Sequence, residues 1–97
     1  MDELIVRLSP IAPTQTLYAI KNGSIIEEKT TTIETDKLIT AITFLCNKYG
    51  LSEVKIIGNE SFAKTISEEL SQKIQVSKYM SNITITYYGG HWLCQNI

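Results

Sequence analysis

The alternation of apolar and polar positions predicts three strands in the first third of the chain. The first is a short apolar run over residues 4–8, which ends before a loop that contains Pro10 and Pro13. Two further runs, over residues 17–21 and 24–29, flank Asn22-Gly23. Asn-Gly tolerates the positive φ angles of a tight type I′ turn, so these runs are predicted to form a β-hairpin. The second arm can extend through residues 30–33.

A helical period follows the hairpin. Thr35 is predicted to cap the helix, and Asp36 places a negative charge in its first turn. Gly50 is expected to end it as the C′ residue. One predicted helix face consists of Leu38, Ile42, Leu45 and Tyr49. The residues predicted to widen this face, so that the helix is buried on more than one side, are Ile39, Ala41, Phe44 and Cys46.

The second half of the chain predicts a strand, a helix and a strand. Residues 54–57 form an apolar run typical of a central strand, and Gly58-Asn59 ends it, with Asn59 as the cap of the next helix. The predicted apolar line of that helix is Phe62, Ala63, Ile66 and Leu70, with Lys64, Ser67, Glu68, Ser71 and Gln72 on the solvent side. Residues 74–79 fit no single pattern. Residues 83–87 alternate as a strand does, and residues 91–94 fit either a last short strand or a packed tail.

The order of elements is therefore β-β-β-α-β-α-β. The front strands are expected to pair antiparallel, and the later strands are expected to be parallel and connected by helical crossovers. Apolar residues make up 43% of the chain and charged residues 20%, as in an ordinary folded domain. We expect residues 1–97 to form a single α/β domain with a mixed sheet.

This order resembles the core of the ribonuclease H-like superfamily. Residues 18–27, an apolar strand, an Asn-Gly turn and a return strand, look like the second and third strands of that fold. Residues 51–59, followed by a helix, are similar to its fourth strand and the turn beyond it. The resemblance covers roughly residues 3–88 and implies a ribonuclease H-like mixed sheet.

The superfamily's chemistry uses two divalent metal ions held by acids at the end of the first strand, in the first helix and after the fourth strand. This chain departs at each place. The first strand carries Arg7 and ends without an aspartate, Asn59 stands where an aspartate is expected, and Asp36 lies at the start of the helix rather than inside it. The resemblance therefore implies a degenerate scaffold that lacks its catalytic acids.

Charge and cysteine content narrow the classes of function. The net charge is −1, and acidic and basic residues interleave along the chain. The charge pattern therefore does not indicate binding to nucleic-acid phosphates, although nucleic-acid binding is not excluded. Cys46 and Cys94 are expected to be core residues of a cytoplasmic protein rather than a disulfide or metal pair. The only other candidate zinc ligand is His91, so we expect no metal site and no cofactor. No apolar run is long enough to span a membrane, and the N-terminus does not resemble a signal peptide, so we expect no membrane association.

The candidate binding residues are aromatic and lie near the C-terminus: Tyr87, Tyr88, His91 and Trp92. Tyr87 and Tyr88 are adjacent on a strand and so face opposite sides of the sheet. An exposed tyrosine near Trp92 would form an aromatic patch suited to a protein interface or to base stacking, with ordinary packing as the simpler interpretation.

The second arm of the hairpin suggests another surface. If residues 24–33 lie at a sheet edge, a second chain can pair with them, and homodimerisation is one form of this hypothesis. Our main functional expectation is a small non-enzymatic binding or adaptor protein that acts through protein–protein contacts or self-association. Its Ile-rich, Ala-poor composition hints at a bacterial or phage source. The alternative is a metal-dependent nuclease or other phosphoryl-transfer enzyme that uses Asp36, Glu60 and Asn59 around one metal ion.

Overall fold

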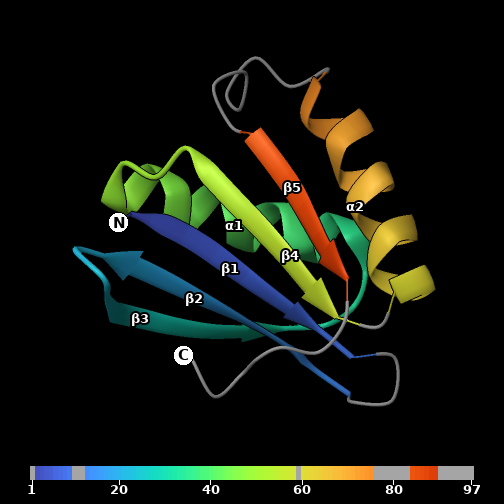
Figure 1. Cartoon of the computed structure of the whole chain (residues 1–97), viewed down its shortest axis with the longest axis horizontal. Coiled ribbons are helices and arrows are strands. Elements are labelled where there is room, and N and C mark those ends of the chain that lie inside the picture. The colour runs from blue at the N-terminus through green and yellow to red at the C-terminus, as the bar shows by residue number, and fades with distance from the viewer. Residues whose placement is uncertain (1, 10–12, 59, 76–83, 90–97) are drawn as a thin grey trace.

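Five strands and two helices make up this computed structural model, which describes residues 2–9, 13–58, 60–75 and 84–89 (Figure 1). The elements in chain order are β1 (Glu3–Leu8), β2 (Gln15–Lys21), β3 (Ser24–Thr31), α1 (Thr35–Tyr49), β4 (Glu53–Gly58), α2 (Glu60–Gln75) and β5 (Thr84–Gly89). The predicted element order is therefore confirmed. The fold is α+β with a mixed sheet, compatible with the expected α/β class.

The sheet has the order β3-β2-β1-β4-β5. β1 and β2 pair antiparallel, as do β2 and β3, whereas β4 is parallel to both β1 and β5. The β2–β3 turn has Asn22 at φ 53° and Gly23 at φ 80°, which is the backbone geometry predicted from Asn-Gly. The antiparallel front and the parallel crossovers through α1 and α2 are both as expected.

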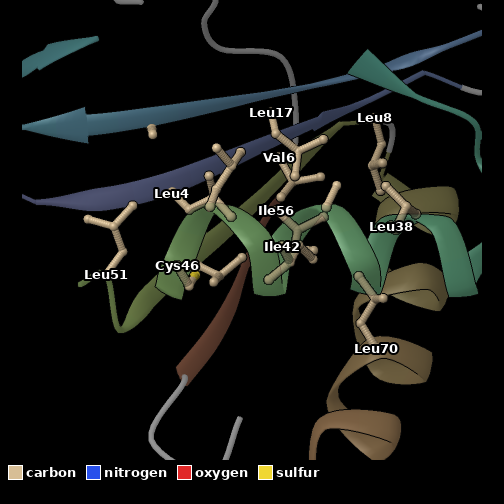
Figure 2. Packing of buried hydrophobic residues seen from close by; sticks show 14 of the residues in the cluster. Leu4, Val6, Leu8, Leu17, Leu38, Ile42, Cys46, Leu51, Ile56 and Leu70 are labelled. Atoms are coloured by element: carbon tan, nitrogen blue, oxygen red, sulfur yellow. The ribbon is translucent and has the colours of Figure 1, made fainter. Parts of the chain in front are cut away.

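One hydrophobic core fills the space between the sheet and the helices (Figure 2). Alternate residues of β1 enter it, and both helices contribute to the same cluster, so α1 and α2 cover one face of the sheet. The labelled core residues in Figure 2 are Leu4, Val6, Leu8, Leu17, Leu38, Ile42, Cys46, Leu51, Ile56 and Leu70. On the opposite face, Ile5, Ile20 and Ile57 form a smaller buried cluster with Tyr18 packed against it.

The predicted ends of α1 are half right. Gly50 follows the helix with φ 67° and donates its backbone N–H to the carbonyl of Cys46, as a C′ glycine should. The N-cap is Glu34, however, and not Thr35, and no side chain caps the helix. The cause is local, because the backbone N–H of Leu38 already bonds the carbonyl of Glu34 at 3.0 Å and so fixes the helical frame there.

Three further expectations need correction. β3 ends at Thr31, and Ile33 lies beyond it, packed against the core. Ser67 was expected on the solvent side of α2 but is buried, and its hydroxyl donates to the carbonyl of Lys64 at 2.9 Å, which satisfies it within the helix. Phe44 was expected to widen the buried face of α1, yet 48% of it is exposed. It comes two positions after Ile42, about 200° around the helix, and so points away from the core.

Candidate functional site

The aromatic residues near the C-terminus are only partly placed. Tyr87 lies opposite Ile56 and Tyr88 opposite Ile57 in the parallel register between β5 and β4. Ile56 belongs to the main core and Ile57 to the cluster on the other face of the sheet. His91 and Trp92 lie outside the described residues.

The described part of the chain contains a different candidate surface, at the edge strand β3. β3 pairs with β2 on one side, and no described strand lies on its other side (Figure 1). The pairing has a bulge, because Ala19 lies opposite Glu27 whereas Ile20 lies opposite Ile25, which leaves Ile26 as an extra residue. Ile25 and Ile26 are 42% and 43% exposed. Two partly exposed apolar side chains thus belong to the strand at the edge of the described sheet.

The outward side of α1 lies beside the same edge strand, on the face of the sheet opposite to Ile25, which pairs with Ile20 of the smaller cluster. The ring of Phe44 is flanked by two ammonium groups, with Lys29 Nζ 5.1 Å and Lys48 Nζ 5.5 Å from its centroid. These distances are within the range of cation–π attraction, worth about 0.5–1 kcal/mol at an exposed site. Since Lys29 is on β3 whereas Phe44 and Lys48 are both on α1, the Lys29–Phe44 contact connects the edge strand to the helix. We call this region the β3–α1 surface: Ile25, Ile26, Glu27, Lys29, Phe44 and Lys48.

Glu27 is the polar centre of the β3–α1 surface. Its carboxylate accepts a hydrogen bond from Lys48 Nζ at 2.8 Å and another from the hydroxyl of Tyr49. The hydrogen bond from Lys48 and, to a smaller extent, the one from Tyr49 lower the pKa of Glu27 below its ordinary value. The same contacts raise the pKa of Lys48 and of Tyr49. The three groups thus form one connected set of polar contacts between β3 and α1.

Sequence reasoning found one part of this surface and missed the other. The possibility that residues 24–33 form a sheet edge came from the length of the hairpin arm. Phe44 was assigned to the core because it is apolar and lies inside an apolar-rich helix. Phe44 lies off the Leu38–Ile42–Leu45 face, and the residues four positions before and after it, Thr40 and Lys48, are polar; this is the signal that could have found it.

Of the residues in the metal-site alternative, the structure describes the side chain of Asp36 and the backbone position of Glu60. Asp36 is exposed, and its carboxylate accepts from Lys73 Nζ of α2 at 2.9 Å, which lowers the pKa of Asp36. Glu60 begins α2, 13 residues before Lys73, and at 1.5 Å per residue this is about 20 Å along the helix. Asn59 lies outside the described residues. Among the residues that the structure describes, no group of three His, Cys, Asp or Glu side chains is placed to hold a metal ion.

The end of β1, where the ribonuclease H-like pattern has an acid, is occupied by a structural contact. The buried side chain of Gln15 accepts a hydrogen bond from the backbone N–H of Ser9 at 2.5 Å and donates to the Ser9 carbonyl at 3.0 Å. These bonds hold the first residue after β1 against the first residue of β2. The amide is therefore used to close the strand connection, with both of its polar atoms occupied.

Cys46 behaves as the core residue that was predicted. It is 2% exposed, and burial raises the pKa of its thiol to about 11. The thiol is then protonated at neutral pH and a poor nucleophile. Cys94 lies outside the described residues.

No helix within the described ranges is long and apolar enough to cross a membrane. Comparison of the chain with protein-family models, with curated proteins and with solved structures gives no match in any of the three.

Proposed function

We propose that this protein is a non-enzymatic binding or adaptor protein that acts through protein–protein contacts, with the β3–α1 surface as its contact site. The observation that carries the proposal is the combination of an open edge strand with exposed Ile25, Ile26 and Phe44 beside it. An edge strand offers unpaired backbone N–H and C=O groups to another chain, and neighbouring apolar side chains contribute the hydrophobic part of the binding energy.

The charged residues of the surface support a selective contact rather than indiscriminate aggregation. Lys29 and Lys48 flank Phe44, and Glu27 of the edge strand accepts a hydrogen bond from Lys48 of the helix. Charged residues and bulges on an edge strand discourage pairing with arbitrary apolar strands. A partner must therefore match the charges as well as the backbone, which is the usual source of specificity at an interface.

A ribonuclease H-like scaffold without its metal site is part of the same proposal. It is supported by three antiparallel strands followed by α1, β4, α2 and β5, which is the element order on which the resemblance depends. Two positions where the pattern has acids fit a non-catalytic role. The end of β1 is closed by the Gln15 amide, and Asp36 is paired with Lys73. The nuclease alternative stays a prediction that no contact among the described residues favours.

The test compares two substitutions that add the same charge to different helices. Phe44→Glu places a carboxylate in the centre of the β3–α1 surface, and Gln72→Glu places one at an exposed position of α2. Each tagged protein, wild type or variant, is co-expressed with an untagged copy of the same sequence. The tag is then used to isolate the bound protein, either the untagged copy or a host protein, from the lysate. We expect a stoichiometric protein to be retained by wild type and by Gln72→Glu, and to fall at least about tenfold with Phe44→Glu.

Circular dichroism of each variant checks that the fold is intact. Equal capture by wild type, Phe44→Glu and Gln72→Glu would contradict the proposed contact site. Capture of nucleic acid that declines with added salt would instead indicate phosphate-driven binding.

A further inference from the structure

We propose that the occupant of the β3–α1 surface is a second copy of this chain, paired antiparallel through β3 about a two-fold axis at Glu28. This inference rests on the proposed function, because it names the partner for the same contact site. An isologous pairing of this kind joins the two sheets into one continuous sheet. The axis is perpendicular to that sheet, so the helices of both copies lie on one face.

The charge pattern of β3 is complementary to itself in this register. Residues equally distant from the axis lie opposite each other, so Glu27 faces the partner's Lys29, and Lys29 faces the partner's Glu27. Glu27 and Lys29 point to the same face of the sheet, because both contact side chains of α1. Opposite charges directly across an antiparallel pair are stabilising, and the symmetry provides this pair twice.

Neighbouring registers lack this match. An axis at Glu27 would place Glu27 opposite the partner's Glu27, and an axis at Lys29 would place Lys29 opposite the partner's Lys29. In each case the remaining charged residue of the helix-covered face would have no oppositely charged residue across from it. An axis between two residues would set side chains of opposite faces against each other, which the strand pleat does not allow. The register centred on Glu28 has one cost, since Glu28 then faces the partner's Glu28 on the other side of the sheet.

The rest of the surface fits the same arrangement. Phe44 is in contact with Lys29, so it stands beside the seam and becomes covered when the partner strand is added. The bulge at Ile26 lies outside the stretch from Glu27 to Lys29, and the register with β2 is regular from Glu27 to Thr31. Glu27 is already held by Lys48 and Tyr49, which reduces the side-chain entropy lost on pairing.

The decisive experiment uses two charge reversals. Each is expected to weaken the dimer when present alone, and a mixture of the two variants is expected to form the dimer again. Lys29→Glu and Glu27→Lys each place like charges opposite each other in a homodimer, and mixing the two variants restores unlike pairs. Sedimentation equilibrium over a concentration series is expected to show a wild-type dimer and at least a tenfold weaker dimer, about 1.4 kcal/mol, for each variant alone. The equimolar mixture is expected to recover the dimer mass. Matched controls are Lys64→Glu and Glu68→Lys on exposed positions of α2, which should dimerise as wild type does.

A separate variant keeps the test valid if Glu27→Lys fails to fold after losing its contacts with α1. Glu28→Gln is nearly isosteric, lies at an exposed position and removes the like-charge pair at the axis. It is expected to tighten the dimer several-fold. A dimer that Glu28→Gln leaves unchanged or weakens would overturn the register.

Two further outcomes separate this inference from the proposed function. A wild-type protein that stays monomeric at the highest concentration, yet captures another protein in a manner lost with Phe44→Glu, overturns the second copy as occupant and leaves the contact site standing. A monomer that captures nothing through Phe44 overturns both. A dimer insensitive to Lys29→Glu uses a different surface and also overturns the inference.

Discussion

Truncating two neighbouring residues of α1 distinguishes its buried face from its exposed face. Leu45 is fully buried in the core, whereas 48% of Phe44 is exposed. Leu45→Ala removes buried methyl groups and leaves a cavity, which costs about 2–5 kcal/mol. Phe44→Ala loses roughly 1 kcal/mol because the ring is only half buried, and roughly 1 kcal/mol of cation–π attraction to Lys29 and Lys48. It regains about 0.5 kcal/mol because alanine has the higher helix propensity. The expected net cost for Phe44→Ala is therefore about 1–1.5 kcal/mol.

Urea titration followed by circular dichroism measures the free energy of unfolding of both variants. The protein concentration is kept below the dissociation constant of any dimer. In thermal unfolding, 1 kcal/mol corresponds to a shift of about 4–8 °C for a chain of this size. The reasoning is refuted if Phe44→Ala is as destabilising as Leu45→Ala under these conditions, since Phe44 would then be buried within a single chain. A cost for Phe44→Ala that grows with protein concentration would instead be the contribution of the second copy.

Three other predictions concern the strand ends, the Glu27 contacts and metal ions. Gly58→Ala would bring its Cβ within 2.6 Å of the carbonyl oxygen of Leu8, so we expect the free energy of unfolding to fall by about 1–2 kcal/mol in urea titrations, after a small gain from a stiffer unfolded chain. The lowered pKa of Glu27 stabilises the fold above its ordinary value of 4.5, and this stabilisation is lost as pH falls through the lowered value. Tyr49→Phe removes one of the bonds responsible, so its stability should decline less steeply with acid than that of wild type. Mg²⁺ or Mn²⁺ should produce no cleavage of DNA or RNA, and any metal-dependent cleavage that disappears in Glu60→Gln would support the nuclease alternative.

The order of elements along the chain and the directions of strand pairing could be anticipated because each step depends on local signals. Asn22-Gly23 set the hairpin, and Gly50 ended α1, since both positions need positive φ. Short connections then made the front strands antiparallel neighbours, and the helices made the later strands parallel. These signals act over a few residues and can be read without knowing the rest of the fold.

The contact surface could be found only in part, because it depends on long-range placement. That β3 is an edge follows from which strands pair, and β1 rather than β3 takes the central place beside β4. The exposure of Phe44 depends on where the core lies around α1. Its contact with Lys29 joins residues 15 positions apart, which no local pattern contains. Hydrophobicity alone gave the wrong face for Phe44, because an apolar residue is also what an interface uses.

The charges that would protect β3 from unwanted pairing are the same ones that would select the partner proposed above. A charged strand is a poor match for an arbitrary apolar edge, because Glu27 and Lys29 would be desolvated against groups that offer them nothing. The same two charges become favourable when the incoming strand carries them in reverse order, which an antiparallel copy of β3 does by symmetry. Discrimination therefore comes from the difference between these two cases rather than from the strength of either contact alone. Since Glu27 is bonded to Lys48 and Tyr49 in the single chain, moving it away from a mismatched strand would cost these two contacts, which adds to the discrimination expected under the proposal.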